Sequence, residues 1–326
     1  MLSVGDRSRP SLEGLRFVVI GPGRLGIGLA LAMRAKGASF LGYASHDGIQ
    51  SEHARALLGL AASATLEDLL ALAPDLFLLT VPDDALPAVA AELGRALRED
   101  QSRRACGKEY FVLHTSGVTS VRVLDLCRDA GAETAVFHPL QTFTEPGQAA
   151  AGFEGIAVAV SAGSRSAEEF GFRVADALGA SPLALADDKR VLYHAAACFA
   201  SNYLVTLESC ARRLFVDAGL PTAEALDLFL PLVRTTVENI SALGPEKALT
   251  GPIARGDVLT VSRHLEELRR AAPDLLELYK VLGLATLGLA GEPGGLTPTT
   301  IAQMRSLLNH GGAGSPRTEI HDRGTP

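Results

Sequence analysis

The 326-residue chain lacks the sequence patterns of secreted, membrane-spanning and nucleic-acid-binding proteins. Its four cysteines form no C-x-x-C pair, which argues against a zinc knuckle or a disulfide framework and fits a reducing cytosol. The first residues, Met1 to Pro10, hold no apolar signal-peptide core, and apolar stretches such as 281–290 are far too short to cross a bilayer. A net charge of -7 and the lack of basic runs argue against a nucleic-acid partner. We expect a cytoplasmic protein, with no metal site, that acts on a small molecule.

Patterning divides the chain into two parts of different character. Short apolar runs alternate with helical segments from Leu15 to about Val160, which is typical of βαβ units and a mostly parallel sheet. The stretch 161–167 is small and polar, and beyond it long helical periodicity dominates. We predict a flexible leader at 1–14, an α/β domain of Rossmann type at 15–162, an all-α domain at 163–309 and a disordered tail at 310–326.

The periodicity also predicts the individual elements. Strands are expected at 15–20, 38–43, 76–81, 110–114, 134–138 and 156–160, with helices at 25–36, 50–59, 66–72, 84–97 and 119–130. Later helices are expected at 167–178, 188–216, 222–242, 257–271, 274–290 and 298–308. Asp257 is a better helix N-cap than a catalyst, and Thr297 followed by Pro298 indicates another helix start.

A glycine-spaced turn follows the first predicted strand and opens the first predicted helix. Gly21 permits the tight bend, Gly23 lets the backbone approach a pyrophosphate, and Gly26 lets the helix pack closely on the strand. The N–H groups at the helix start carry a partial positive charge. A ligand-free glycine turn is the alternative, but this order of strand, turn and helix favours a dinucleotide site formed by Gly21, Pro22, Gly23, Arg24, Leu25 and Gly26.

Turn and polar residues also follow the other predicted strands. Ligands of parallel sheets bind outside the carboxyl ends of the strands. The residues after the third and fourth strands therefore collect where a cofactor would lie, and they include Pro82, Asp83, Ser116 and Gly117.

The end of the second strand decides between NADP and NAD. An acidic residue there binds the ribose 2′-hydroxyl of NAD, whereas other groups accommodate the 2′-phosphate of NADP. Ala44 stands at the usual position of the acid, and Ser45 and His46 can hydrogen-bond a phosphate. Asp47 lies close to the expected acid spacing but past the strand end, so NADP is favoured and NAD is the alternative. A plain polar turn would explain the same residues.

Two histidines, His114 and His138, follow strands, and a third stands on a later helix. Histidine moves protons readily near neutral pH, although a histidine at a strand end is more often structural. His138 is the stronger candidate for a substrate contact.

On the helix predicted at 188–216, a polar stripe is formed by His194, Cys198, Ser201 and Asn202 at spacings i, i+4, i+7 and i+8. The stripe fits either a hydrogen-bonded helix contact or a substrate face.

A loop from Leu249 to Asp257 contains a Thr-Gly-Pro turn and a single arginine. Arg255 could bind a substrate carboxylate or phosphate with its planar fork. It could equally pair with Asp257 or cap a helix.

These motifs together resemble a bacterial family that joins a Rossmann-like domain to a helical domain of unknown function. The family is similar to the superfamily with a 6-phosphogluconate-dehydrogenase-like C-terminal domain, which includes ketopantoate and pyrroline-5-carboxylate reductases. The resemblance covers about 15–309 and is carried by the glycine loop, Val81-Pro82-Asp83-Asp84, His114-Thr115-Ser116-Gly117, 137–143, Tyr193-His194-Ala195-Ala196, Ser201-Asn202 and 249–257.

The resemblance implies an NADP-dependent oxidoreductase that dimerises through its helical domain. It implies that His194, Ser201 and Asn202 face the nicotinamide, and that the cofactor cleft is lined by Val81, Pro82, Ser116 and Gly117. Because hydride addition leaves negative charge on the substrate, His194 is the best candidate proton donor, and Ser201 and Asn202 would orient the substrate. Cys198 stands where related hydroxyacid dehydrogenases have a lysine, and His46 stands where the family often has an arginine. We expect hydride transfer between NADP(H) and a small carbonyl, imine or hydroxy compound. The alternative is a regulatory protein that senses NADP(H) without chemistry.

Overall fold

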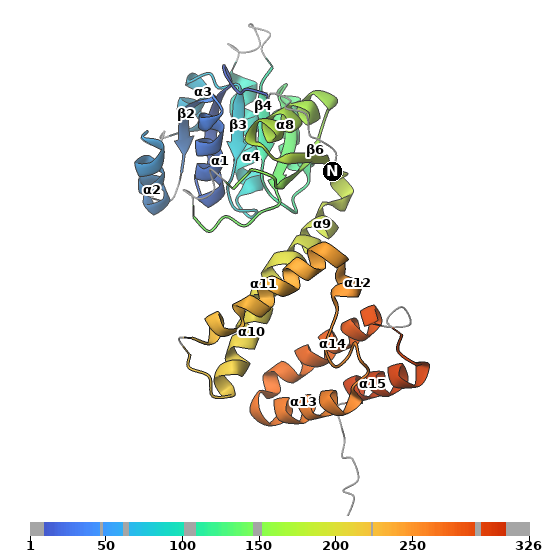
Figure 1. The fold of residues 1–326 in the computed structure, drawn as a ribbon. Coiled ribbons are helices and arrows are strands. Elements are labelled where there is room, and N and C mark those ends of the chain that lie inside the picture. Colours follow the sequence, from blue (N-terminus) through green and yellow to red (C-terminus); the bar gives the residue numbers. More distant parts are fainter. Residues whose placement is uncertain are drawn as a thin grey trace, which may run out of the picture. The chain divides into compact units, whose positions relative to one another are not determined.

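The structure is a computed structural model that describes residues 10–45, 48–60, 65–100, 109–145, 152–222, 224–290 and 295–310. The chain divides into two compact units, Met1–Asn202 and Tyr203–Pro326. Figure 1 shows the strands gathered in the first unit and only helices in the second. A mostly parallel α/β unit followed by a helical one is the fold class that the sequence predicted.

The first unit contains a seven-stranded sheet in the order β2-β1-β3-β4-β5-β6-β7. Its strands pair in parallel, except that β5 and β6 are antiparallel. Because β1, β3, β4 and β5 run in one direction, their carboxyl ends meet at one edge of the sheet. The strands are β1 (Arg16–Ile20), β2 (Ser39–Ala44), β3 (Leu76–Leu79), β4 (Phe111–His114), β5 (Glu133–Pro139), β6 (Ala157–Ala162) and β7 (Ser181–Ala184).

Helices cover both faces of the sheet, and the alternating side chains of β1 show why. Phe17 and Val19 join one buried cluster, whereas Val18 and Ile20 join another on the opposite face. The first cluster includes residues of α1 (Arg24–Ala35), α2 (Gly48–Leu58) and α8 (Arg165–Leu178). The second includes residues of α3 (Leu66–Ala71), α4 (Leu86–Glu99), the 3-10 turn Val121–Leu124 and α6 (Asp125–Asp129).

The sheet continues past the expected domain boundary at 162–163. After α8, the helix cap Gly179 takes a φ of 83°, and the chain enters β7, which the sequence reading missed. β7 is a short edge strand with a proline, so it carries little of the alternating pattern that reveals strands. The first unit therefore ends only at Asn202.

The helix expected at 188–216 is interrupted. A 3-10 turn (Asp187–Lys189) leads into α9 (Arg190–Ala197), which is followed by a π-helical turn at Cys198–Asn202. A π turn inserts a residue into the helical register, and such turns are frequent at functional sites. The side chains of 198–202 therefore project differently from the continuous α-helical stripe that the sequence predicted.

In the second unit, helices are the regular elements of the described residues, and α13, α14 and α15 share a small core with the loop before α13. Asp257 caps α13 as predicted, because its carboxylate accepts a 3.0 Å hydrogen bond from the Thr260 N–H. Thr297 likewise accepts from the Thr300 N–H at 3.2 Å at the start of α15. The core consists of Ile253, Val261, Leu265, Leu287, Met304 and Leu308. The helices are α10 (Tyr203–Asp217), α11 (Ala225–Leu243), α12 (Pro245–Ala248), α13 (Val258–Ala271), α14 (Pro273–Ala290) and α15 (Pro298–His310). Within the described ranges, no helix has the length and apolar character needed to cross a membrane.

Candidate functional site

The glycine loop begins directly after β1. Two independent features, the backbone conformation and the lack of space, require glycine at its first position, Gly21. Gly21 has a φ of 83°, a conformation that side chains rarely adopt. A Cβ at this position would also lie 2.5 Å from Val81 Cγ1 and 2.9 Å from the Val81 backbone nitrogen. The Gly21 N–H donates to the Ala44 carbonyl at 2.9 Å, which ties the loop to the end of β2. The loop therefore packs directly against Val81, two residues after the end of β3.

Thr80 connects the loop to α1, and the sequence reading did not single it out. Its hydroxyl donates a 2.6 Å hydrogen bond to the Gly21 carbonyl. A Cβ on Gly26 would overlap this hydroxyl and lie 2.9 Å from the same carbonyl oxygen. Gly26 therefore permits the close approach of helix, loop and strand end that the spacing predicted. A small hydroxyl residue at the end of a strand was the available signal for Thr80.

The N-terminus of α1 has the properties of an anion site. Gly23 is the N-cap, no side chain caps the helix, and its first turn contains no acidic residue. The first N–H groups of a helix lack intrahelical partners and attract negative charge. Arg24 is exposed in this first turn, and Leu25 is half-buried. Nearby, Ser45 follows β2 and is half-buried, whereas His46 and Asp47 lie outside the described residues.

At the end of β4, His114 is fully buried. Its Nδ1 accepts a 3.2 Å hydrogen bond from the Ser116 N–H. Burial, reinforced by the Arg190 charge, lowers the pKa of His114 to about 3, so the ring is neutral. The Ser116 hydroxyl accepts from the Thr119 N–H at 2.9 Å and gives the following loop a fixed turn. His114 therefore shapes this loop rather than the surface of a cleft.

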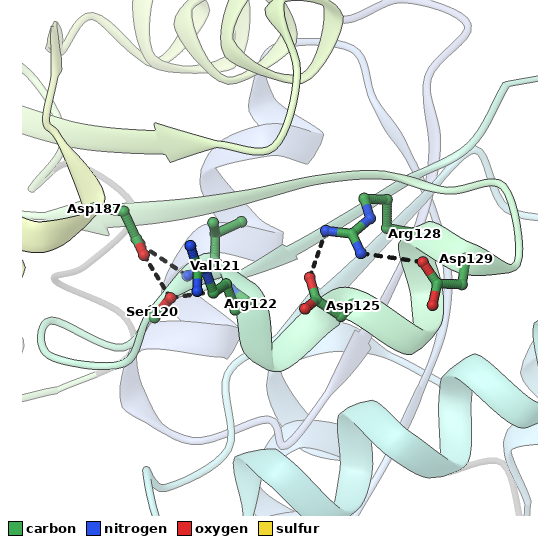
Figure 2. A network of polar contacts seen from close by, with 7 residues as sticks. All are labelled: Ser120, Val121, Arg122, Asp125, Arg128, Asp129 and Asp187. Atoms are coloured by element: carbon green, nitrogen blue, oxygen red, sulfur yellow. Dashed lines mark hydrogen bonds and ion pairs between the residues drawn. The ribbon is translucent and has the colours of Figure 1, made fainter.

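An aspartate just before α9 holds the same loop from the other side. The Asp187 carboxylate accepts hydrogen bonds from the Ser120 hydroxyl at 2.5 Å and from the Val121 N–H at 2.9 Å (Figure 2). Arg190, the first residue of α9, lies three residues after Asp187 and is fully buried. It also donates hydrogen bonds to carbonyls of this loop. Neither residue was among the predicted site residues. Charged residues at an apolar helix start were the only signal in the sequence.

A pocket of about 430 Å³ opens between the end of β5 and the α9 segment. The structure brings together the predicted His138, His194, Ser201 and Asn202 on its wall, together with Tyr193, which the prediction omitted. The His138 ring meets the Tyr193 and His194 rings edge-on, with centroids 5.7 Å and 5.8 Å apart. Cys198 of the predicted stripe is not among the lining residues.

Several buried polar atoms at this site have no hydrogen-bond partner among the described residues. They are His114 Nε2, His138 Nδ1, Tyr193 Oη and His194 Nδ1. An unpaired buried polar group costs about 1–3 kcal/mol, so such atoms are normally satisfied by a water or a ligand. Three of the four belong to residues that line the pocket. The pocket wall therefore offers polar atoms that a bound molecule or water could hydrogen-bond.

Two titratable groups of the pocket wall, His138 and Tyr193, are uncharged at neutral pH. Burial is the main reason why the pKa of His138 is lowered to about 4, and electrostatic interactions with Arg190 and His194 act in the same direction. Burial also raises the pKa of the Tyr193 phenol, so the hydroxyl keeps its proton. A neutral imidazole offers one donor and one acceptor, and the phenol offers a donor.

The remaining predicted residues lie elsewhere. Val81 contacts the position of Gly21 as described, while Pro82 and Asp83 are exposed. Arg255 is exposed in the turn before α13, within the second unit. Among the described residues, no group of three or more His, Cys, Asp or Glu side chains is placed to hold a metal ion.

Comparison with known families identifies both parts of the chain. The Rossmann-like domain family matches residues 6–139, and the domain of unknown function DUF2520 matches residues 156–286. The two matches follow each other in the order Rossmann-like domain, then DUF2520. They confirm the resemblance to proteins that join a Rossmann-like domain to a domain of unknown function. None of the curated proteins in the comparison matches the chain.

Solved structures share the fold at low sequence identity. A Bacteroides fragilis protein with the provisional name NADP oxidoreductase is 23% identical, with a TM-score of 0.69 over 85% of this chain and 100% of its own. A pyrroline-5-carboxylate reductase from Streptococcus pyogenes is 16% identical, with a TM-score of 0.58 over 90% and 99%. A reductive aminase from Aspergillus terreus in complex with NADPH and ethyl-5-oxohexanoate is 16% identical, with a TM-score of 0.52 over 91% and 93%.

Proposed function

We propose that the protein is an NADP-dependent oxidoreductase that transfers a hydride between NADP(H) and a small carbonyl, imine or hydroxy compound. One observation carries this proposal. The glycine cradle after β1 and the pocket after β5 lie at the carboxyl ends of strands that run in one direction. A dinucleotide on the cradle would therefore extend along the sheet edge toward the pocket.

The residues of the cradle fit a pyrophosphate. The positions of Gly21 and Gly26 have no room for a Cβ, and the α1 N-terminus has neither a side-chain cap nor an acidic neighbour. The names of the Bacteroides and Aspergillus proteins support NADP over NAD. Ser45 at the end of β2 would contribute to the adenosine side, as would His46.

In the pocket, side chains of the protein would donate a proton to the substrate heteroatom during reduction and accept it in the reverse direction. The bound nicotinamide supplies or accepts the hydride. Addition of a hydride leaves negative charge on the substrate heteroatom, so a donor must lie close to it. His194 is proposed as this donor, and Ser201 and Asn202 would orient the heteroatom. The neutral His138 and the protonated Tyr193 would supply further hydrogen bonds.

We also infer that two copies associate through the helical unit. Helix α11 exposes several large apolar side chains: Leu228, Leu232, Val237, Ile240 and Leu243 are 57%, 67%, 50%, 44% and 54% exposed. Full burial of such a side chain contributes about 1.5–3 kcal/mol, and covering its exposed half contributes roughly half of that. Exposed apolar side chains at this density on one helix are typical of an interface.

Binding of NADPH and NADH to the purified protein tests the proposal. Nicotinamide fluorescence is the suitable signal, since the chain contains no tryptophan that could serve as an energy donor. Micromolar binding of NADPH with weaker binding of NADH supports the proposal and justifies a screen of carbonyl and imine substrates. Absence of binding to both nucleotides contradicts it. Tight binding without turnover across the screen favours the sensor alternative.

A further inference from the structure

The buried Arg190 is the most unusual charged group of the first unit. Its side chain is fully buried, yet it forms no ion pair with a carboxylate among the described residues. Burial of a guanidinium is costly, and the carboxylates of Asp187 and Asp83 favour its charge without forming an ion pair with it. The guanidinium must therefore find its hydrogen-bond partners elsewhere, and these partners show which part of the fold it holds in place.

The guanidinium instead bonds to neutral acceptors from two segments. It donates to the carbonyls of Ser116, Gly117 and Thr119, with the latter two at 3.2 Å and 3.0 Å. It also donates to the Ser161 hydroxyl of β6 at 3.0 Å. Ser161 in turn donates to the Leu185 carbonyl at 2.7 Å. The planar fork thus fixes the backbone of the loop after β4 against the start of α9.

The loop held by Arg190 is the surface against which the rings of His138 and His194 pack. A Cβ on Gly117 would overlap His194 Nδ1 and lie 2.9 Å from His138 Nε2, so both rings pack against this glycine. His194 stands one helical turn after Arg190 on the same helix. Rotation or displacement of the loop would therefore move the surface on which both rings rest.

We propose that Arg190 is a positioning residue that sets the orientation of the His138 and His194 rings through the Ser116–Thr119 backbone. Its fork holds three carbonyls at once, which a lysine ammonium on a flexible stem cannot reproduce in the same plane. The inference rests on the proposed function only for the chemical role of His194. The contacts themselves involve no cofactor.

The charge of Arg190 acts on two buried imidazoles near the loop, those of His138 and His114. The groups that face His138 are Arg190 and His194 from α9 and Asp83 from the loop after β3, and both Arg190 and His194 favour the neutral ring. The groups that face His114 are Arg190, Asp187 and His138. Arg190 therefore holds the loop under the His138 and His194 rings and opposes protonation of His138 and His114.

The test is nuclear magnetic resonance of the full-length protein labelled with ¹⁵N-histidine, in which long-range correlations report each ring nitrogen. Arg190→Lys keeps the charge and removes the fork, whereas Arg190→Gln removes both. The matched control is Arg128→Gln, because Arg128 is an exposed helical arginine of the same unit with two carboxylate partners at 2.6 Å and 3.1 Å (Figure 2). Thermal unfolding is recorded for every variant.

We expect Arg190→Lys to move the ring signals of both His138 and His194, with Arg128→Gln leaving them unchanged. In Arg190→Gln, the pKa of His138 should also rise from about 4 toward 6.5. If Arg190→Gln does not fold, the lysine variant decides. Lower stability with unchanged ring signals in Arg190→Lys would overturn the proposal. NADPH binding of the wild type is measured separately, so loss of the proposed function and loss of the positioning role give different results.

Discussion

The substitution Gly26→Ala tests the glycine cradle most directly. The added methyl group would overlap the Thr80 hydroxyl and approach the Gly21 carbonyl oxygen to 2.9 Å. The first contact involves a side chain that itself bonds to the loop, and the second involves backbone, so α1 must move away from the loop. Overpacking of this kind costs about 1–3 kcal/mol, and the higher helix propensity of alanine offsets about 1 kcal/mol.

The effect on nucleotide binding should be larger than the effect on stability. A small displacement of α1 weakens hydrogen bonds from its first N–H groups to the pyrophosphate. Loss of one hydrogen bond to a charged group costs about 1.5–3 kcal/mol, which raises the Kd for NADPH roughly 10- to 150-fold. The assay is a fluorescence titration with NADPH, together with thermal unfolding.

A matched control separates the cradle from the general effect of replacing glycine in a helix. Gly288 lies in α14, and a Cβ at this position meets no atom within 4 Å. Gly288→Ala should therefore keep the wild-type Kd and gain up to about 1 kcal/mol in stability. A folded Gly26→Ala protein with wild-type affinity for NADPH would refute the assignment of the cradle.

Thr80→Val removes the 2.6 Å hydrogen bond to the Gly21 carbonyl at nearly constant volume, so we expect about 1 kcal/mol lower stability in urea unfolding and several-fold weaker NADPH binding. The free energy of unfolding should fall as the pH drops from 6.5 toward about 4, because the unfolded chain protonates His138 at the ordinary pKa while the folded ring stays neutral. Urea midpoints at several pH values measure this loss, which His138→Gln should reduce; an unchanged pH dependence would contradict the lowered pKa. Leu232→Glu places a charge on the 67% exposed apolar position of α11 and should yield monomers in sedimentation experiments, whereas Glu238→Gln on the same helix should not. Monomeric wild-type protein would rule out the inferred association.

Much of the fold could be read from local patterns. The apolar run of β1 and the turn at Gly21 indicated the first strand and helix, since both depend on residues adjacent in sequence. The longer helices of the second unit follow the predicted ranges closely, because their apolar periodicity is local and the starts of α13 and α15 carry N-caps. The strand β7 was not predictable in the same way, because an edge strand of four residues has too short a pattern.

In the candidate site too, some features follow from the sequence and others only from the fold. The sequence by itself determined the residue types that the site uses, including Gly21, Gly26 and the polar residues His138 and His194. Only the tertiary structure decided which of them meet. Cys198 belongs to the predicted stripe but does not line the pocket, and the π turn at Cys198–Asn202 is helix geometry that no spacing rule contains. Arg190 and the Ser116–Thr119 backbone are distant in sequence and become partners only when β4 and α9 are brought together. A backbone carbonyl has no sequence signature, so a residue whose partners are carbonyls can be recognised only in the folded chain.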